Sequence, residues 1–273
     1  MAKLILFAFL LFNFSCATGK KSGFELSQKL RAKLFSTQNN FEKYLASGDP
    51  LFNNLNNKEC LADWEKSVSE LNKKLRKVSS DQQRSEIWFT LGNCYNYTQE
   101  FRKSLYYYDL VLTFEKNDAQ KISKIMSNIG LIYDIQGLSA LARSYYQNSL
   151  KHNRSNHLAN YLLSLDYLRQ GNFAKANEGL ELLAKQLPNS RVVRSSLGVS
   201  FVLSGNNLEL RNKVLSFFNE KDEEAILLKS GIKLINGEVS RDRIADLKDL
   251  ELKFSVLDDF RDYLITSFGQ KNG

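Results

Sequence analysis

Residues 88–95 read WFTLGNCY, and a similar order of residue types recurs three times further along the chain. The pattern has a large, an apolar, a small and an aromatic position at offsets 0, 3, 4 and 7, so all four share one face of an α-helix. From one copy to the next, the small residue moves by 38, 34 and 34 positions. This recurrence predicts an array of helical repeats. The copies are Trp88, Leu91, Gly92 and Tyr95; Met126, Ile129, Gly130 and Tyr133; Asn160, Leu163, Ser164 and Tyr167; and Arg194, Leu197, Gly198 and Phe201.

A second helix is expected after each of these helices. Gly137, Gly171 and Gly205 mark the turns and are 34 residues apart. Four extra residues between 114 and 121 are expected to lengthen the loop between the first two repeats. Small residues should let the paired helices approach closely, and enlarging one of them should overpack the contact. They are Gly92, Gly130, Ser164 and Gly198 on the first helices, and Ala142 and Ala176 on the second.

The composition agrees with a helical protein. Only two prolines occur, and Leu outnumbers Val and Ile together. Leu favours helices whereas β-branched residues favour strands, so this balance argues against an all-β fold. The fold class predicted is all-α.

Over residues 85–219 these motifs resemble the tetratricopeptide repeat family, whose signature the segment from Trp88 to Tyr95 matches closely. The chain departs from that pattern at Asn160 and Arg194, where the first large residue is polar, and at Leu210, where alanine is usual. The resemblance implies a right-handed α-solenoid of stacked antiparallel helix pairs.

The flanking regions are also expected to be helical. Residues 24–80 should form N-terminal helices, the clearest of them running through Trp64, Leu71 and Leu75. Residues 220–273 should form a degenerate fifth repeat, with a second helix at Ile244, Leu247 and Leu250, followed by a capping helix around Phe254–Leu264.

The first fifteen residues have the features of a signal peptide, with Lys3 followed by an apolar run too short to cross a bilayer. Ser15 and Cys16 resemble a bacterial lipoprotein lipobox, although Asn13 and Phe14 depart from it. The resemblance implies lipidation at Cys16, a flexible tether over residues 16–23 and, because Ala17 follows, an outer-membrane location facing the periplasm. The alternative is an ordinary secretory signal and release into the periplasm.

Export would place Cys60 and Cys94 in an oxidising compartment, where they could form a disulfide or remain buried free thiols. The sequence contains no catalytic motif, metal-ligand spacing or cofactor loop, so the protein is predicted not to be an enzyme and to need no metal or cofactor. His152 and His157 are expected to be exposed loop residues. No nucleic acid and no small-molecule substrate are expected as partners.

In the tetratricopeptide repeat family the first helices line a concave groove, and the resemblance carries those positions onto this chain. The groove should begin polar and become apolar toward the fourth repeat, where either a partner or the C-terminal helix would cover it. The residues are Phe89, Asn93, Asn96 and Tyr97; Lys124, Ser127, Leu131 and Asp134; Tyr161, Leu165, Leu168 and Arg169; and Val192, Ser195, Val199 and Val202.

The leading functional hypothesis is a lipid-anchored scaffold or adaptor that binds an envelope protein in this groove. It resembles lipoproteins that serve pilus, secretion or cell-wall complexes. A second hypothesis follows from the net charge of +8 and the basic residues Lys73, Lys74, Arg76 and Lys77, which could bind anionic wall polymer or lipid. A solvated helix face would also account for that cluster. The third hypothesis is an enzyme with an unrecognised site.

Overall fold

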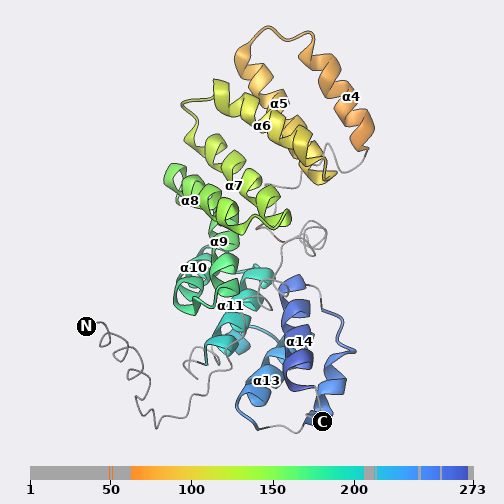
Figure 1. Cartoon of the computed structure of the whole chain (residues 1–273), viewed down its shortest axis with the longest axis vertical. Helices are drawn as coiled ribbons and strands as arrows, with labels where there is room; N and C mark the ends of the chain where they lie inside the picture. The colour runs from red at the N-terminus through yellow and green to blue at the C-terminus, as the bar shows by residue number, and fades with distance from the viewer. Residues whose placement is uncertain are drawn as a thin grey trace, which may run out of the picture.

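The computed structural model describes residues 49, 51, 63–205, 212, 214–238, 241–252 and 254–269. Within this part the chain is all-α, and its ten α-helices pack in sequence as antiparallel pairs, as expected for a helical repeat solenoid (Figure 1). None of the helices described here has the length and apolar character that a membrane crossing requires. Several predictions lie outside the described residues: the signal peptide, Cys16 and its tether, the helices expected before residue 63, Cys60 and Leu210.

Three complete helix pairs form the middle of the array. Each first helix contacts its own second helix and the next first helix along the chain, so the first helices line one side. They also carry more buried residues than the second helices. The pairs are α5 (Asp81–Tyr97) with α6 (Phe101–Phe114), α7 (Ala119–Ile135) with α8 (Ser139–His152), and α9 (His157–Arg169) with α10 (Phe173–Gln186).

Helices flank the middle pairs on both sides, and the array runs from α4 at one end to α13 and α14 at the other (Figure 1). Before them, α4 (Trp64–Leu75) packs against α5 and confirms the helix expected there. After them come α11 (Arg191–Ser204), α13 (Glu223–Ile235), the 3₁₀ helix η3 (Arg241–Leu247) and α14 (Ser255–Phe268).

The helices α5, α7, α9 and α13 end in one recurring turn. The residue in the left-handed conformation is Gln99 (φ 60°), Gly137 (78°), Gly171 (72°) or Gly237 (73°). The next residue donates its backbone N–H to a carbonyl oxygen five positions earlier, which closes a Schellman motif. These bonds, of 2.8–2.9 Å, join Glu100 to Tyr95, Leu138 to Tyr133, Asn172 to Tyr167 and Glu238 to Lys233.

Small residues face bulky ones where two helices cross. A Cβ atom at Gly92 would lie 2.6 Å from the ring of Tyr108, and one at Gly130 would lie 2.6 Å from the ring of Tyr146. In the third pair both facing residues are small, because Gly179 on α10 lies against the hydroxyl of Ser164 on α9. Close approach therefore recurs in these three pairs, and the predicted small residue of each first helix lies at the contact.

The segment predicted as the second helix of a fifth repeat is a 3₁₀ helix instead, and it ends at Leu247, before Leu250. The physical reason is that α14 takes the place of a second helix. It packs against both α11 and α13, and the ring of Phe260 lies against Gly231 as Tyr108 lies against Gly92. The C-terminal helix thus closes the apolar end of the array.

Candidate functional site

The predicted groove residues are mostly interior. Phe89, Tyr97 and Lys124 are half-buried, so they are the ones that a partner could touch directly. The remaining residues carried over from the resemblance are all buried: Asn93, Asn96, Ser127, Leu131, Asp134, Tyr161, Leu165, Leu168, Arg169, Val192, Ser195, Val199 and Val202.

A buried ion pair connects the second and third pairs. The guanidinium of Arg169 donates from Nη2 to Oδ2 of Asp134 at 3.0 Å, and its Nη1 lies 2.9 Å from Oδ1 of the same carboxylate in an ion pair. Their side chains are 8% and 1% exposed, which leaves almost no water to solvate either charge. Burial by itself would lower the pKa of Arg169, but Asp134 and Asp166 together with Tyr146 outweigh it and raise that pKa above its ordinary value. Such a pair is costly to break from one side.

Asp166 extends this ion pair toward the surface. One of its carboxylate oxygens (Oδ2) accepts from Nε of Arg143 and from Nε2 of Gln170, each at 2.6 Å. The other oxygen (Oδ1) accepts from Nη2 of Arg169 at 3.4 Å. Because Arg143 lies on α8 and Asp134 on α7, the network holds three helices in one arrangement.

Asn93, expected to contact a partner, is engaged inside the protein. Its side-chain oxygen accepts from the hydroxyl of Tyr108 at 2.7 Å and from the amide of Asn128 at 3.1 Å. Burial raises the pKa of Tyr108 and keeps its hydroxyl protonated as a donor. This neutral cluster joins α5, α6 and α7. Asn93 therefore holds these helices together, and its side-chain oxygen already accepts two hydrogen bonds within the protein.

The apolar end of the predicted groove is covered by the chain itself. Besides α14, which packs against α11, Asp49 lies at the N-terminus of α11. Its carboxylate accepts from the Ser190 hydroxyl at 2.8 and 3.0 Å and from the backbone N–H of Val192 at 3.3 Å. Leu51, only 2% exposed, belongs to the same buried cluster as Tyr161 and Leu165. The sequence had raised the C-terminal helix as a cover, but nothing in it indicated Asp49 or Leu51.

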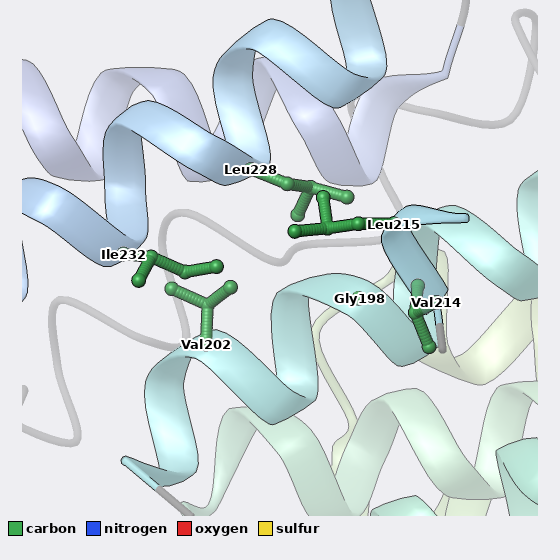
Figure 2. Close-up of a pocket in the computed structure, with 6 residues that line it drawn as sticks. All are labelled: Gly198, Val202, Val214, Leu215, Leu228 and Ile232. Carbon is green, nitrogen blue, oxygen red and sulfur yellow. The ribbon is translucent and has the colours of Figure 1, made fainter. Parts of the chain in front are cut away.

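A small cavity lies where α11 meets α13. Figure 2 shows apolar side chains directed toward it, with no polar group among the lining residues. Without a hydrogen-bonding group the cavity has nothing to orient a ligand, so we interpret it as part of the packing between α11 and α13. Its lining residues are Gly198, Val202, Val214, Leu215, Leu228 and Ile232.

The described residues contain no group of three His, Cys, Asp or Glu side chains placed to hold a metal ion. His152 is the last residue of α8 and is exposed, and His157 is the first residue of α9 and is half-buried. His152 is exposed as expected, but both histidines lie at helix ends and His157 is half-buried, since both helices extend further than the sequence indicated. Cys94 is fully buried and disulfide-bonded, and both other cysteines, Cys16 and Cys60, lie outside the described residues.

The basic cluster is a surface feature. Lys73, Lys74, Arg76 and Lys77 are all exposed at the C-terminal end of α4. Cations at this end of a helix interact favourably with its dipole, which accounts for their position without a ligand.

Comparison with known proteins adds no relative: no family model matches the sequence, and no curated protein matches it either.

Proposed function

We propose that the protein is a non-catalytic tetratricopeptide-type scaffold, lipid-anchored in the bacterial envelope, that holds a protein partner along its first helices. The observation that carries this proposal is the register of the helix pairs, in which the same close crossings and the same turns recur. Repeated pairs of this kind form extended surfaces that suit protein binding. The partner surface would include the half-buried Phe89, Tyr97 and Lys124.

The buried networks support this proposal because a scaffold must hold its surface in one geometry. Arg169 with Asp134, and Asn93 with Tyr108, fix neighbouring helices through directional bonds. A partner surface built on rigid helices loses less conformational freedom on binding.

Site-specific crosslinking in cells tests the binding surface. A photoreactive phenylalanine analogue at Tyr97 should capture one dominant partner. The same analogue at Tyr106, which is 61% exposed on the second helix α6, serves as the matched control and should capture much less. Equal capture at both positions, or none at Tyr97, would overturn the proposed surface.

The disulfide of Cys94 supports the proposed location, because disulfides persist in oxidising compartments such as the periplasm. The lipid anchor is tested by metabolic labelling with a fatty acid. The wild-type protein should be labelled and a Cys16→Ala variant should not. An unlabelled wild type would leave the alternative of a secreted periplasmic protein.

The exposed basic cluster favours a second candidate function, binding to anionic wall polymer or lipid. Vesicles containing phosphatidylglycerol should then sediment the protein at low salt. Neutral phosphatidylcholine vesicles should not. Changing Lys73, Lys74 and Lys77 to Gln should abolish this sedimentation. If sedimentation survives these changes, the basic cluster is only a solvated helix face.

A further inference from the structure

The longer loop between the first two helix pairs creates a cleft that the proposed groove does not include. It has a volume of about 660 Å³ and lies between the start of α5, the end of α6 and the start of α7. The loop, which is four residues longer than in the later repeats, contributes Glu115, Asn117 and Asp118 to the lining of the cleft. It is therefore a feature of this chain rather than of the repeat pattern.

The lining of the cleft is acidic although the chain as a whole is basic. Four carboxylates line it, those of Asp81, Glu86, Glu115 and Asp118, against one ammonium group, that of Lys121. Lys121 pairs with Glu86 and lies 3.4 Å from Glu115, and Arg84, outside the lining, lies 3.4 Å from Asp81, so the two cations neutralise only part of this charge. The cleft keeps an excess of negative charge in a chain whose net charge is +8.

A buried hydroxyl in the lining has no hydrogen-bond partner within the part of the chain that the structure describes. Ser85 is 2% exposed, lines the cleft, and makes no hydrogen bond there through its Oγ atom. A buried polar atom left unsatisfied costs about 1–3 kcal/mol. A donor group that entered the cleft would supply the missing bond after a rotation of this short side chain.

An aromatic ring completes the lining. Phe114 ends α6, is 51% exposed, and has its ring 5.2 Å from that of Trp88. Such an open aromatic face attracts a cation, and a guanidinium more than an ammonium because it is planar and can stack. Carboxylates also bind a guanidinium through two parallel hydrogen bonds.

We propose that this cleft binds an arginine side chain in a basic peptide segment of a partner protein. Glu86 and Asp81 would accept from the guanidinium, Phe114 would stack on it, and Ser85 would accept one further N–H. An organic cation fits better than a metal ion, because the described residues include no group of three metal-binding side chains close enough together. The proposal concerns a surface separate from the groove and stands or falls independently of it.

Titration with short peptides tests the cleft. The probe is a capped Gly-Arg-Gly peptide, and the readout is the fluorescence of Trp88 in a Trp64→Phe background, since the chain has only two tryptophans. The arginine peptide should bind in a salt-sensitive manner. Its citrulline counterpart, which has the same shape without the charge, should bind at least tenfold more weakly. Equal binding of the two peptides, or no binding of either, would overturn the proposal.

Variants of the lining residues test whether the arginine peptide binds in the cleft. The double change Asp81→Asn with Glu86→Gln should raise the dissociation constant at least tenfold, because it removes two of the accepting carboxylates. The charge-matched control is Glu178→Gln with Glu181→Gln on α10, which should change it less than twofold. Ser85→Ala should weaken binding about threefold without lowering the melting temperature. Unchanged binding in the Asp81/Glu86 variant overturns the proposal, and so does displacement of the peptide by equimolar Ca²⁺.

Discussion

The two ends of the array are stabilised differently. In α5, α7 and α9 the buried side includes Asn93, Asp134 and Arg169, which form hydrogen bonds and ion pairs to neighbouring helices. In α11 the corresponding side is largely apolar, with Val199 and Val202 buried and α14 packed against the helix. Directional bonds specify one geometry, whereas apolar burial is non-directional and depends on what covers it. Helix α4 packs against α5 at the other end, but the apolar side of α11 is buried by α14, with Asp49 bonded at the start of α11.

The largest effect should come from breaking the buried ion pair. Arg169→Ala removes the guanidinium that pairs with the buried carboxylate of Asp134, so we expect a loss of about 3–5 kcal/mol in the free energy of unfolding. Urea denaturation measures it.

A double variant then separates the worth of the pair from the penalty of leaving one charge buried. Arg169→Met together with Asp134→Leu should recover most of the lost stability, because neither charge of this pair remains buried and Asp166 keeps Arg143 as its partner. A loss below about 1 kcal/mol in Arg169→Ala would mean that the stability of the helices α7 and α9 does not depend on this ion pair.

Glycine substitutions should distinguish the two ends next. In Gly130→Ala the new Cβ meets the buried ring of Tyr146 and, at 3.2 Å, the backbone oxygen of Ala142, so we expect a loss of about 1–3 kcal/mol. In Gly198→Ala its closest neighbour, at 2.7 Å, is the flexible tip of Leu228, so the loss should be smaller. Thermal unfolding of both variants gives the order, and the reverse order would contradict it.

Removing the carboxylate at the start of α11 should have a moderate effect. Asp49→Ala deprives Ser190 and the N–H of Val192 of an acceptor, and we expect a loss of about 1–2 kcal/mol. Asp63→Ala is the matched control, since Asp63 caps α4 through a single exposed bond to Lys66. It should cost less in the same denaturation assay. Equal losses would argue against a special role for Asp49 at the apolar end.

The smallest effect should be a gain in stability from a substitution in the turn after α5. Gln99 adopts the left-handed conformation that glycine holds in the later turns, which strains a residue with a side chain. Gln99→Gly should therefore stabilise the protein by about 1 kcal/mol. The converse change, Gly137→Gln, should destabilise it by a similar amount. A rise in melting temperature in the first variant and a fall in the second would confirm this, and no change in either would refute it.

The sequence predicted the array of helix pairs well because the residues that mark its turns and buried faces lie close together in the chain. Glycines at a fixed spacing mark the turns, and the small and aromatic residues of each helix identify its buried face. The turn at Gln99 carried no such signal, since glutamine does not favour positive φ and only the register with the other repeats places a turn there.

The interior of the predicted groove could not be predicted in the same way. Periodicity placed Asp134 and Arg169 on the first helices, but it does not say which charged groups meet across two helices. Likewise, the contact of Asp49 with Ser190 joins residues 141 positions apart, and no local pattern encodes such a distance. Burial of these residues thus depends on tertiary contacts rather than on repeat geometry.

The contact of Asp49 with the start of α11 also bears on how the chain acquires its structure. A repeat array can form unit by unit as the polypeptide emerges from the ribosome, because each unit contacts only its neighbours. Ser190 is synthesised 141 residues after Asp49, so the bond between them forms only when most of the array already exists. Asp49 can therefore bond to the start of α11 only after the first three helix pairs have been synthesised, and a chain truncated before α11 would lack the donors that hold Asp49 there.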